Sequence, residues 1–273
     1  MPEDSSNSDP ADAREEIPAG PERTVVFLGS AAIAGAPVAY VIVLSAVVAV
    51  FSFIPFSIAL SAGSSFPMAQ GLYTLNGWLL GPWAGAAASG VGALVGVFLA
   101  PHTSGIPWIT VGGAAMGAIF AGAIAPGPHR RRLAWLLMLL VALEVVVYGH
   151  HAIVRNGVRP WVLIFGYLTH VVAIALFVLP TRSWMATLIA SPNLKRVALG
   201  LFLATWTAAS LMMFTESLLS YLLLNWPEQL FIMFIGVIPL EHAARSGIGA
   251  VVGTGVIAGL RAMSLVKPRE ATY

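Results

Sequence analysis

Long apolar runs separated by short polar breaks are the main pattern of this chain. A helix of about 20 apolar residues is long enough to cross the hydrocarbon core of a bilayer. We therefore expect an all-α, polytopic transmembrane helix bundle of about eight spans, with six as the lower bound. The predicted spans are roughly 33–56, 64–80, 83–100, 107–126, 133–154, 161–180, 197–224 and 240–264.

Three segments interrupt this regular pattern. Pro55 and the small polar residues Ser61–Ser65 predict a broken or re-entrant segment around the start of the short second span. Leu80-Gly81-Pro82 predicts a hinge between the second and third spans. Phe231–Pro239 is apolar but too short to cross, so an interfacial helix and an extension of the last span both fit it.

Glycine and alanine dominate the third predicted span. Small residues let helix backbones approach closely in a bilayer, where apolar burial no longer drives helix association. Gly90, Gly92 and Gly96 lie within a span and do not follow a strand. We therefore interpret them as packing glycines and not as a dinucleotide-binding fingerprint.

Composition supports a membrane protein. The chain is 58% hydrophobic and 10% charged, far from the soluble average. It contains no cysteine, which excludes disulfides, thiolate metal sites and cysteine nucleophiles. The basic residues sit beside predicted spans, where membrane topology explains them, so we expect no nucleic-acid partner.

Three regions are predicted along the chain. Residues 1–23 form an acidic, disordered cytoplasmic tail, 24–266 a transmembrane helical domain, and 267–273 a short cytoplasmic tail. With an inner N-terminus and eight crossings, eleven Lys and Arg residues fall on the inner side and two, Arg155 and Arg159, on the outer side. Basic residues are retained in the cytoplasm. Both termini should therefore be cytoplasmic, in a multi-pass protein of the cell (inner) membrane.

Ionisable side chains inside a bilayer are costly unless they are paired or face a cavity, so each is a functional candidate. In the predicted orientation several fall in the outer half, where a pocket open to the outside would gather them. Gln70, Tyr73 and Asn76 add neutral hydrogen-bonding groups on one helix face. The predicted ligand-binding residues are Glu216, Glu241, His242, Arg245, Gln70 and Asn76.

Structural roles remain open for the same residues. Glu241 and Arg245 are spaced i, i+4 and would neutralise each other on one helix. Glu216 precedes Ser220 by one turn and would serve equally as a hydrogen-bonding group. His150 and His151 lie near the outer end of the fifth span, as interfacial residues would.

Other chemistry has little support in the sequence. His170 would suit an axial haem ligand only with a facing partner at the same depth. We find no GxxxxGK[ST] loop, no HExxH and no paired-carboxylate metal motif. We therefore expect no metal, no cofactor and no enzymatic activity.

Part of the chain resembles the substrate-capture (S) subunits of energy-coupling-factor vitamin importers. The matching residues are Ile54-Pro55-Phe56, Phe66-Pro67 and Leu79–Ala86, and the resemblance covers roughly 31–126 and, more weakly, 238–263. The usual six-helix plan of that family leaves two of the eight spans unexplained. The resemblance implies a small-residue face that docks on a transmembrane partner, here formed by Ala32, Gly35, Ala36 and Ala39.

The resemblance implies an importer subunit that binds a small, vitamin-like molecule. Its energy would come from partners, namely a membrane coupling subunit and cytoplasmic ATPases. Two alternatives remain open. One is a non-transporting membrane subunit or sensor that binds a cytoplasmic or membrane partner. The other is a proton-coupled secondary transporter that uses Glu144 or Glu216 as its proton site.

Overall fold

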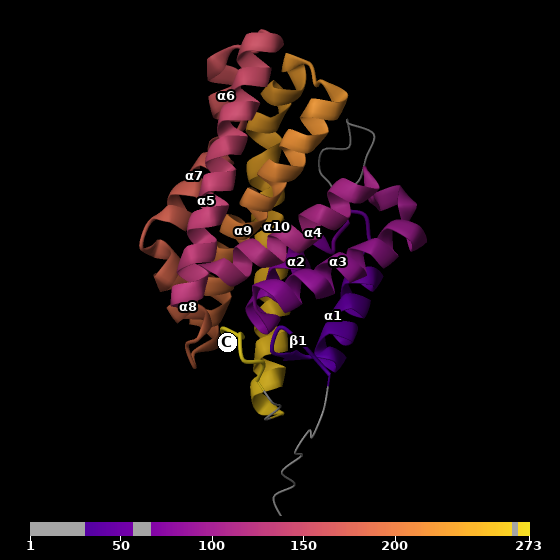
Figure 1. Ribbon diagram of the computed structural model, residues 1–273, viewed down its shortest axis with the longest axis vertical. Helices are drawn as coiled ribbons and strands as arrows, with labels where there is room; N and C mark the ends of the chain where they lie inside the picture. Colours follow the sequence, from indigo (N-terminus) through magenta and orange to yellow (C-terminus); the bar gives the residue numbers. More distant parts are fainter. Residues whose placement is uncertain (1–30, 57–66, 264–266) are drawn as a thin grey trace, which may run out of the picture. The chain divides into compact units, whose positions relative to one another are not determined.

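The computed structural model describes residues 31–56, 67–263 and 267–273 (Figure 1). The predicted acidic tail at 1–23 and the predicted break at Ser61–Ser65 lie outside these residues. The two flanks of that break are paired, because Pro55 and Pro67 form an antiparallel bridge and Met68 N donates to Ile54 O at 2.9 Å.

The described residues form ten α-helices and one short two-stranded hairpin, so the all-α prediction is confirmed. Proline occupies the first turn of α3, α4, α5 and α6, where its missing N–H costs no hydrogen bond. In chain order the elements are β1 Ala32–Ile33, β2 Ala36–Pro37, α1 Val38–Phe51, α2 Gln70–Leu80, α3 Pro82–Leu99, the 3₁₀ turn η3 Pro101–Thr103, α4 Pro107–Ile124, α5 Pro128–Gly149, the π-helical turn η4 His150–Arg155, α6 Pro160–Gly166, α7 Leu168–Val178, α8 Thr181–Ile189, α9 Leu194–Leu224 and α10 Glu228–Ala262.

Five of these helices are long and apolar enough to cross a membrane: α3, α4, α5 with η4, α9 and α10. The pair α6 and α7 would make a sixth span, bent by 61° at its break. Helix α1 has 14 residues and α2 has 11, fewer than the roughly 20 that a full crossing needs. The number of eight spans and the cytoplasmic termini therefore stay predictions.

The last predicted span is longer than the sequence indicated. Helix α10 begins at Glu228, so the apolar segment Phe231–Pro239 is its N-terminal part, and of the two alternatives the extension is confirmed. Pro239 lies inside this helix. Proline within a helix removes one backbone hydrogen bond, which made a boundary at this position plausible from sequence alone.

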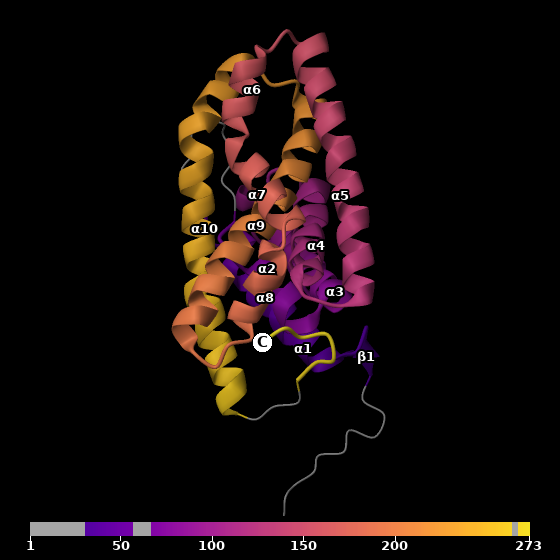
Figure 2. The same cartoon turned by 90° about the vertical axis from the view of Figure 1, so that its left-hand side faces the viewer.

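Helix α2 is the most enclosed element, since all of its residues are buried. It packs against α3, α4, α9 and α10, and Figure 2 shows it between α10 on one side and α5 on the other. It ends at the predicted hinge, where Gly81 adopts φ 86° and lets α3 start directly at Pro82. L side chains rarely adopt this φ, which explains the glycine.

The small residues serve the close packing that the sequence predicted. An added Cβ at Gly92 would lie 2.5 Å from Ser45 O, and one at Gly96 would lie 2.5 Å from Ser52 Oγ, so α3 and α1 touch through these two glycines. Gly90 is packed less tightly, because its added Cβ would be 3.8 Å from Ala115. Backbone contact of this kind is how helices associate in lipid.

The expectation that Ala32, Gly35, Ala36 and Ala39 share one helical face is wrong. The first helix begins at Val38, and the residues before it form a hairpin in which Ala32 pairs with Pro37 and Ile33 with Ala36. Gly35 has φ 82°, outside the helical region. Small residues at four-residue spacing are compatible with a glycine turn as well as with a helix.

Residues 267–273 pack onto the bundle. Arg130 at the start of α5 pairs with Glu270 at 2.9 Å and donates to Thr272 Oγ1 at 3.1 Å. Thr272 N donates to Trp78 O at the end of α2, at 2.9 Å. Both views place the C-terminus between α8 and β1 (Figures 1 and 2). The predicted tail is therefore part of the packed structure.

The basic residues are divided unevenly between the two ends of the long helices. Arg155 and Arg159 flank the start of α6, at the end opposite to α8 and the C-terminus (Figure 2). The α8 end carries Arg130, Arg131, Arg132, Arg182, Lys195, Arg196, Arg261, Lys267 and Arg269. This distribution has the asymmetry from which the inner side was predicted.

Candidate functional site: a cavity lined by two buried glutamates

A largely apolar cavity of 330 Å³ lies between the start of α4, the C-terminal half of α9 and the first half of α10. Two of the predicted ligand-binding residues, Glu216 and Glu241, are in its wall. Its lining consists of Gly105, Ile106, Ile109, Thr110, Met213, Glu216, Ser217, Ser220, Leu224, Trp226, Leu230, Phe234, Val237, Ile238 and Glu241. A concave apolar site with a few convergent polar groups is typical of small-molecule binding.

Glu216 is the polar residue of this wall with unused hydrogen-bonding capacity. Its side chain is buried, and Oε1 has no hydrogen-bond partner among the residues that the structure describes. Buried polar atoms normally have a partner, so a ligand donor or a water is expected at this oxygen. The carboxylate also has no ion-pair partner within 4.0 Å in the described part of the chain.

Gly113 on α4 leaves room for the Glu216 side chain. An added Cβ at Gly113 would lie 2.5 Å from Glu216 Cδ and 2.7 Å from Cγ, and it would overlap Oε1. The carboxylate therefore rests against the α4 backbone. An added Cβ at the neighbouring Gly112 would meet no atom within 4 Å. The sequence shows a Gly-Gly pair here, but nothing in it indicates which glycine faces α9.

Glu241 and Arg245 form a buried ion pair. Arg245 Nη2 donates to Glu241 Oε2 at 3.1 Å, and Arg245 Nη1 donates to His242 Nδ1 at 3.3 Å. The two charged side chains are 5% and 1% exposed. The pairing that this i, i+4 spacing predicted is therefore present, and a ligand role for these residues stays a prediction. Arg245 and His242 lie behind Glu241 and do not line the cavity.

The charges around the cavity favour a positively charged ligand group. Two carboxylates line the wall, and the nearest guanidinium, Arg245, interacts electrostatically with both Glu241 and Glu216. One guanidinium thus lies near two acidic side chains. An anionic ligand group would have to approach both of these acidic groups, whereas an ammonium or another strong donor would give the Glu216 oxygen the partner that it lacks.

Further unpartnered polar atoms lie behind the cavity wall. Both ring nitrogens of His170 on α7, Nε2 of His242 and the hydroxyl of Tyr73 on α2 lack hydrogen-bond partners within the described ranges. The His170 and His242 rings are 5.4 Å apart, centroid to centroid. Tyr73 lies near Glu216. These atoms form a polar interior between α2, α7, α9 and α10. A sequence pattern does not predict it, because the atoms come from separate helices.

Gln70 and Asn76 do not line this cavity, so a ligand contact by either residue stays a prediction. Asn76 Nδ2 donates to Ser89 Oγ at 2.9 Å, which ties α2 to α3. Gln70 is buried at the start of α2. Helical spacing correctly puts both on one helix, but it does not show which neighbouring helix they face.

The remaining candidates, Glu144, His150 and His151, do not line the cavity. Glu144 on α5 is buried and accepts a hydrogen bond from Thr215 Oγ1 at 3.1 Å. His151 Nε2 lies 3.3 Å from Asn225 Oδ1, and His150 is exposed. Across the described residues, no group of three or more His, Asp or Glu side chains is arranged to hold a metal ion.

Comparison with known proteins finds no matching family model, no matching curated protein and no matching solved structure. The geometry of the cavity is therefore the observation from which a function is inferred.

Proposed function

We propose that the protein is an integral membrane protein that binds a small organic molecule in the Glu216 cavity. The observation that carries this proposal is the buried Glu216 carboxylate, which lines an apolar cavity with one oxygen lacking a partner among the described residues. The ligand has an ammonium or other strong donor group and an apolar body. Its positive group contacts Glu216, and its body contacts side chains such as Trp226 and Phe234.

In this proposal the bound molecule is the cargo of an importer. The protein acts as the substrate-binding subunit, and a membrane coupling subunit with cytoplasmic ATPases supplies the energy. This part of the proposal rests on the sequence resemblance to energy-coupling-factor S subunits at Leu79–Ala86, which includes the Leu80-Gly81-Pro82 hinge. Because Ala32–Pro37 form a hairpin, they do not provide the helix face on which a coupling subunit was expected to dock.

The proposed site is tested by thermal unfolding of the purified protein in detergent. Thiamine, which carries a fixed positive charge, and benzylamine are expected to raise the melting temperature, while biotin and uncharged benzyl alcohol are not. Saturation to 100 times Kd corresponds to about 2.7 kcal/mol of stabilisation. Glu216→Gln should abolish these shifts while leaving the empty protein at least as stable, because it removes a buried charge without an ion-pair partner.

Glu228→Gln is the matched control, since Glu228 belongs to a surface pair with Arg159 and should leave every ligand shift intact. The proposal fails if neither cation shifts the wild type, or if the shift survives in Glu216→Gln.

A proton-coupled secondary transporter is the second candidate, and the buried Glu144 favours it. Within the described residues, the Thr215 hydroxyl donates a hydrogen bond to this carboxylate at 3.1 Å. Substrate uptake into proteoliposomes driven by a pH gradient alone, and lost in Glu144→Gln, would select this candidate over the partner-energised importer.

A further inference from the structure

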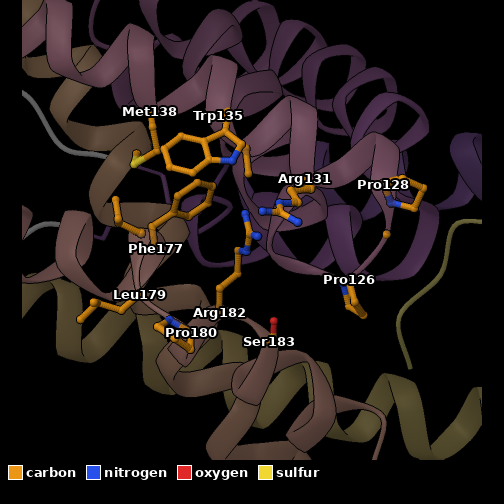
Figure 3. Close-up of a pocket in the computed structure, with 13 residues that line it drawn as sticks. Pro126, Pro128, Arg131, Trp135, Met138, Phe177, Leu179, Pro180, Arg182 and Ser183 are labelled. Atoms are coloured by element: carbon orange, nitrogen blue, oxygen red, sulfur yellow. The ribbon is translucent and has the colours of Figure 1, made fainter.

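A second cavity, of 590 Å³, lies at the opposite end of the bundle from the Glu216 cavity and shares no residue with it. It is enclosed by the connection between α4 and α5, the first turns of α5, the end of α7 and the start of α8 (Figure 3). Its lining combines two arginines with large apolar side chains, chiefly Trp135, Met138 and Phe177.

Arg131 of α5 and Arg182 of α8 turn their guanidinium groups toward each other in this cavity (Figure 3). In the described residues neither side chain has an ion pair or a hydrogen bond. Partial burial and the neighbouring charge of Arg131 both lower the pKa of the Arg182 guanidinium. Arginine nevertheless stays protonated in proteins, so two positive charges oppose each other here.

Arg130, the residue before Arg131, is an arginine whose charge is neutralised by a carboxylate. Arg130 pairs with Glu270 at 2.9 Å and also donates to Thr272. Arg131 and Arg182 lack such a carboxylate in the described part of the chain. A phosphate between them would accept hydrogen bonds from both guanidinium groups and remove their repulsion.

The apolar side of the cavity continues into a surface suited to lipid chains. Trp135 is 62% exposed beside the arginines, and further along the same helix Leu136, Leu139 and Leu143 are 65%, 69% and 60% exposed. Tryptophan at such a boundary and basic residues next to it are typical of the membrane interface. The guanidinium groups therefore lie where a headgroup would sit if acyl chains cover α5.

We propose that this cavity binds one acidic phospholipid, with the phosphate between Arg131 and Arg182 and an acyl chain along Trp135 and Met138. The end of the bundle that carries this cavity is the predicted cytoplasmic side, where basic pockets between helices recognise anionic headgroups. A zwitterionic lipid fits less well, because its choline would add a third positive charge near the two arginines.

Native mass spectrometry in a nonionic detergent tests the proposal, with dioleoylphosphatidylglycerol and dioleoylphosphatidylcholine added separately and in competition. The wild type should retain one phosphatidylglycerol with at least about tenfold preference, which corresponds to about 1.4 kcal/mol. Arg131→Gln with Arg182→Gln should remove the preference. Arg132→Gln, an exposed arginine on the same turn that does not line the cavity, should keep it.

Two further arms separate a lipid from a free anion and from a folding defect. Inorganic phosphate at 10 times the lipid concentration should not displace phosphatidylglycerol, and Trp135→Ala should weaken lipid retention. The empty double variant should melt no lower than the wild type, because a repulsion has been removed; if it does not fold, Arg131→Gln alone is measured instead. Equal retention of both lipids, displacement by phosphate, or undiminished binding by the arginine variant would each overturn the proposal.

Discussion

Replacing Arg245 by glutamine is expected to lower the free energy of unfolding by about 3–5 kcal/mol, because it leaves the buried Glu241 carboxylate without its counter-charge. Arg245 is 1% exposed and donates to both Glu241 and His242. A buried carboxylate that loses its partner must either remain charged in an apolar interior or take up a proton. The loss should therefore appear in the melting temperature of the protein without any ligand.

A double-mutant cycle separates this pair from a ligand contact. Glu241→Gln combined with Arg245→Gln should recover much of the stability lost by Arg245→Gln, with a coupling energy of about 1–3 kcal/mol. Arg159→Gln is the control, because it breaks the exposed pair with Glu228 and should cost no more than about 1 kcal/mol. Equal, small losses in Arg245→Gln and Arg159→Gln would contradict a buried pair.

Replacing Gly113 by alanine is expected to cost about 1–3 kcal/mol of stability and to eliminate ligand-dependent stabilisation. The new methyl group would occupy the space of the Glu216 carboxylate, with Cδ only 2.5 Å away. Glu216 would have to leave its position in the cavity wall. Both effects are measured by thermal unfolding with and without benzylamine.

The adjacent glycine provides the matched control. An added Cβ at Gly112 meets no atom within 4 Å, so Gly112→Ala should be neutral or stabilising by up to about 1 kcal/mol through helix propensity. Combining Gly113→Ala with Glu216→Ser, which removes the carboxylate, should restore stability without restoring the ligand response. If the two alanine variants behave alike, Glu216 does not lie against Gly113.

Helix boundaries were predictable where the sequence contains residues that favour one backbone conformation. Gly81 followed by Pro82 disfavours continuation of a helix and favours the start of a new one, and α2 and α3 meet at this point. The residues around Ala36 show the opposite case. Their spacing suits a helix face, yet Gly35 in the left-handed region makes them a hairpin.

The site was predictable only in part, because a helical pattern describes one helix at a time. Glu216 and Glu241 were recognised as costly groups in an apolar run, and the cavity does bring them together. Asn76 was assigned to the same pocket, but it bonds to Ser89 on α3. Contacts between helices far apart in sequence decide these outcomes, and hydrophobic periodicity carries no information about them.

The proposal that the Glu216 cavity is accessible and binds cations is tested most directly by cysteine modification, because the sequence contains no cysteine. Ser220 lines the cavity, and Ser220→Cys can be treated with cationic trimethylammonium-ethyl or anionic sulfonatoethyl methanethiosulfonate. Each rate is normalised to the same reagent at the exposed His102→Cys. The cationic reagent should react about tenfold faster, which corresponds to about 1.4 kcal/mol of attraction.

Adding Glu216→Gln should bring the normalised ratio close to one, because the carboxylate that attracts the cation is gone. A cysteine at 220 that does not react in the folded protein, or a ratio that Glu216→Gln leaves unchanged, would contradict a ligand cavity governed by Glu216.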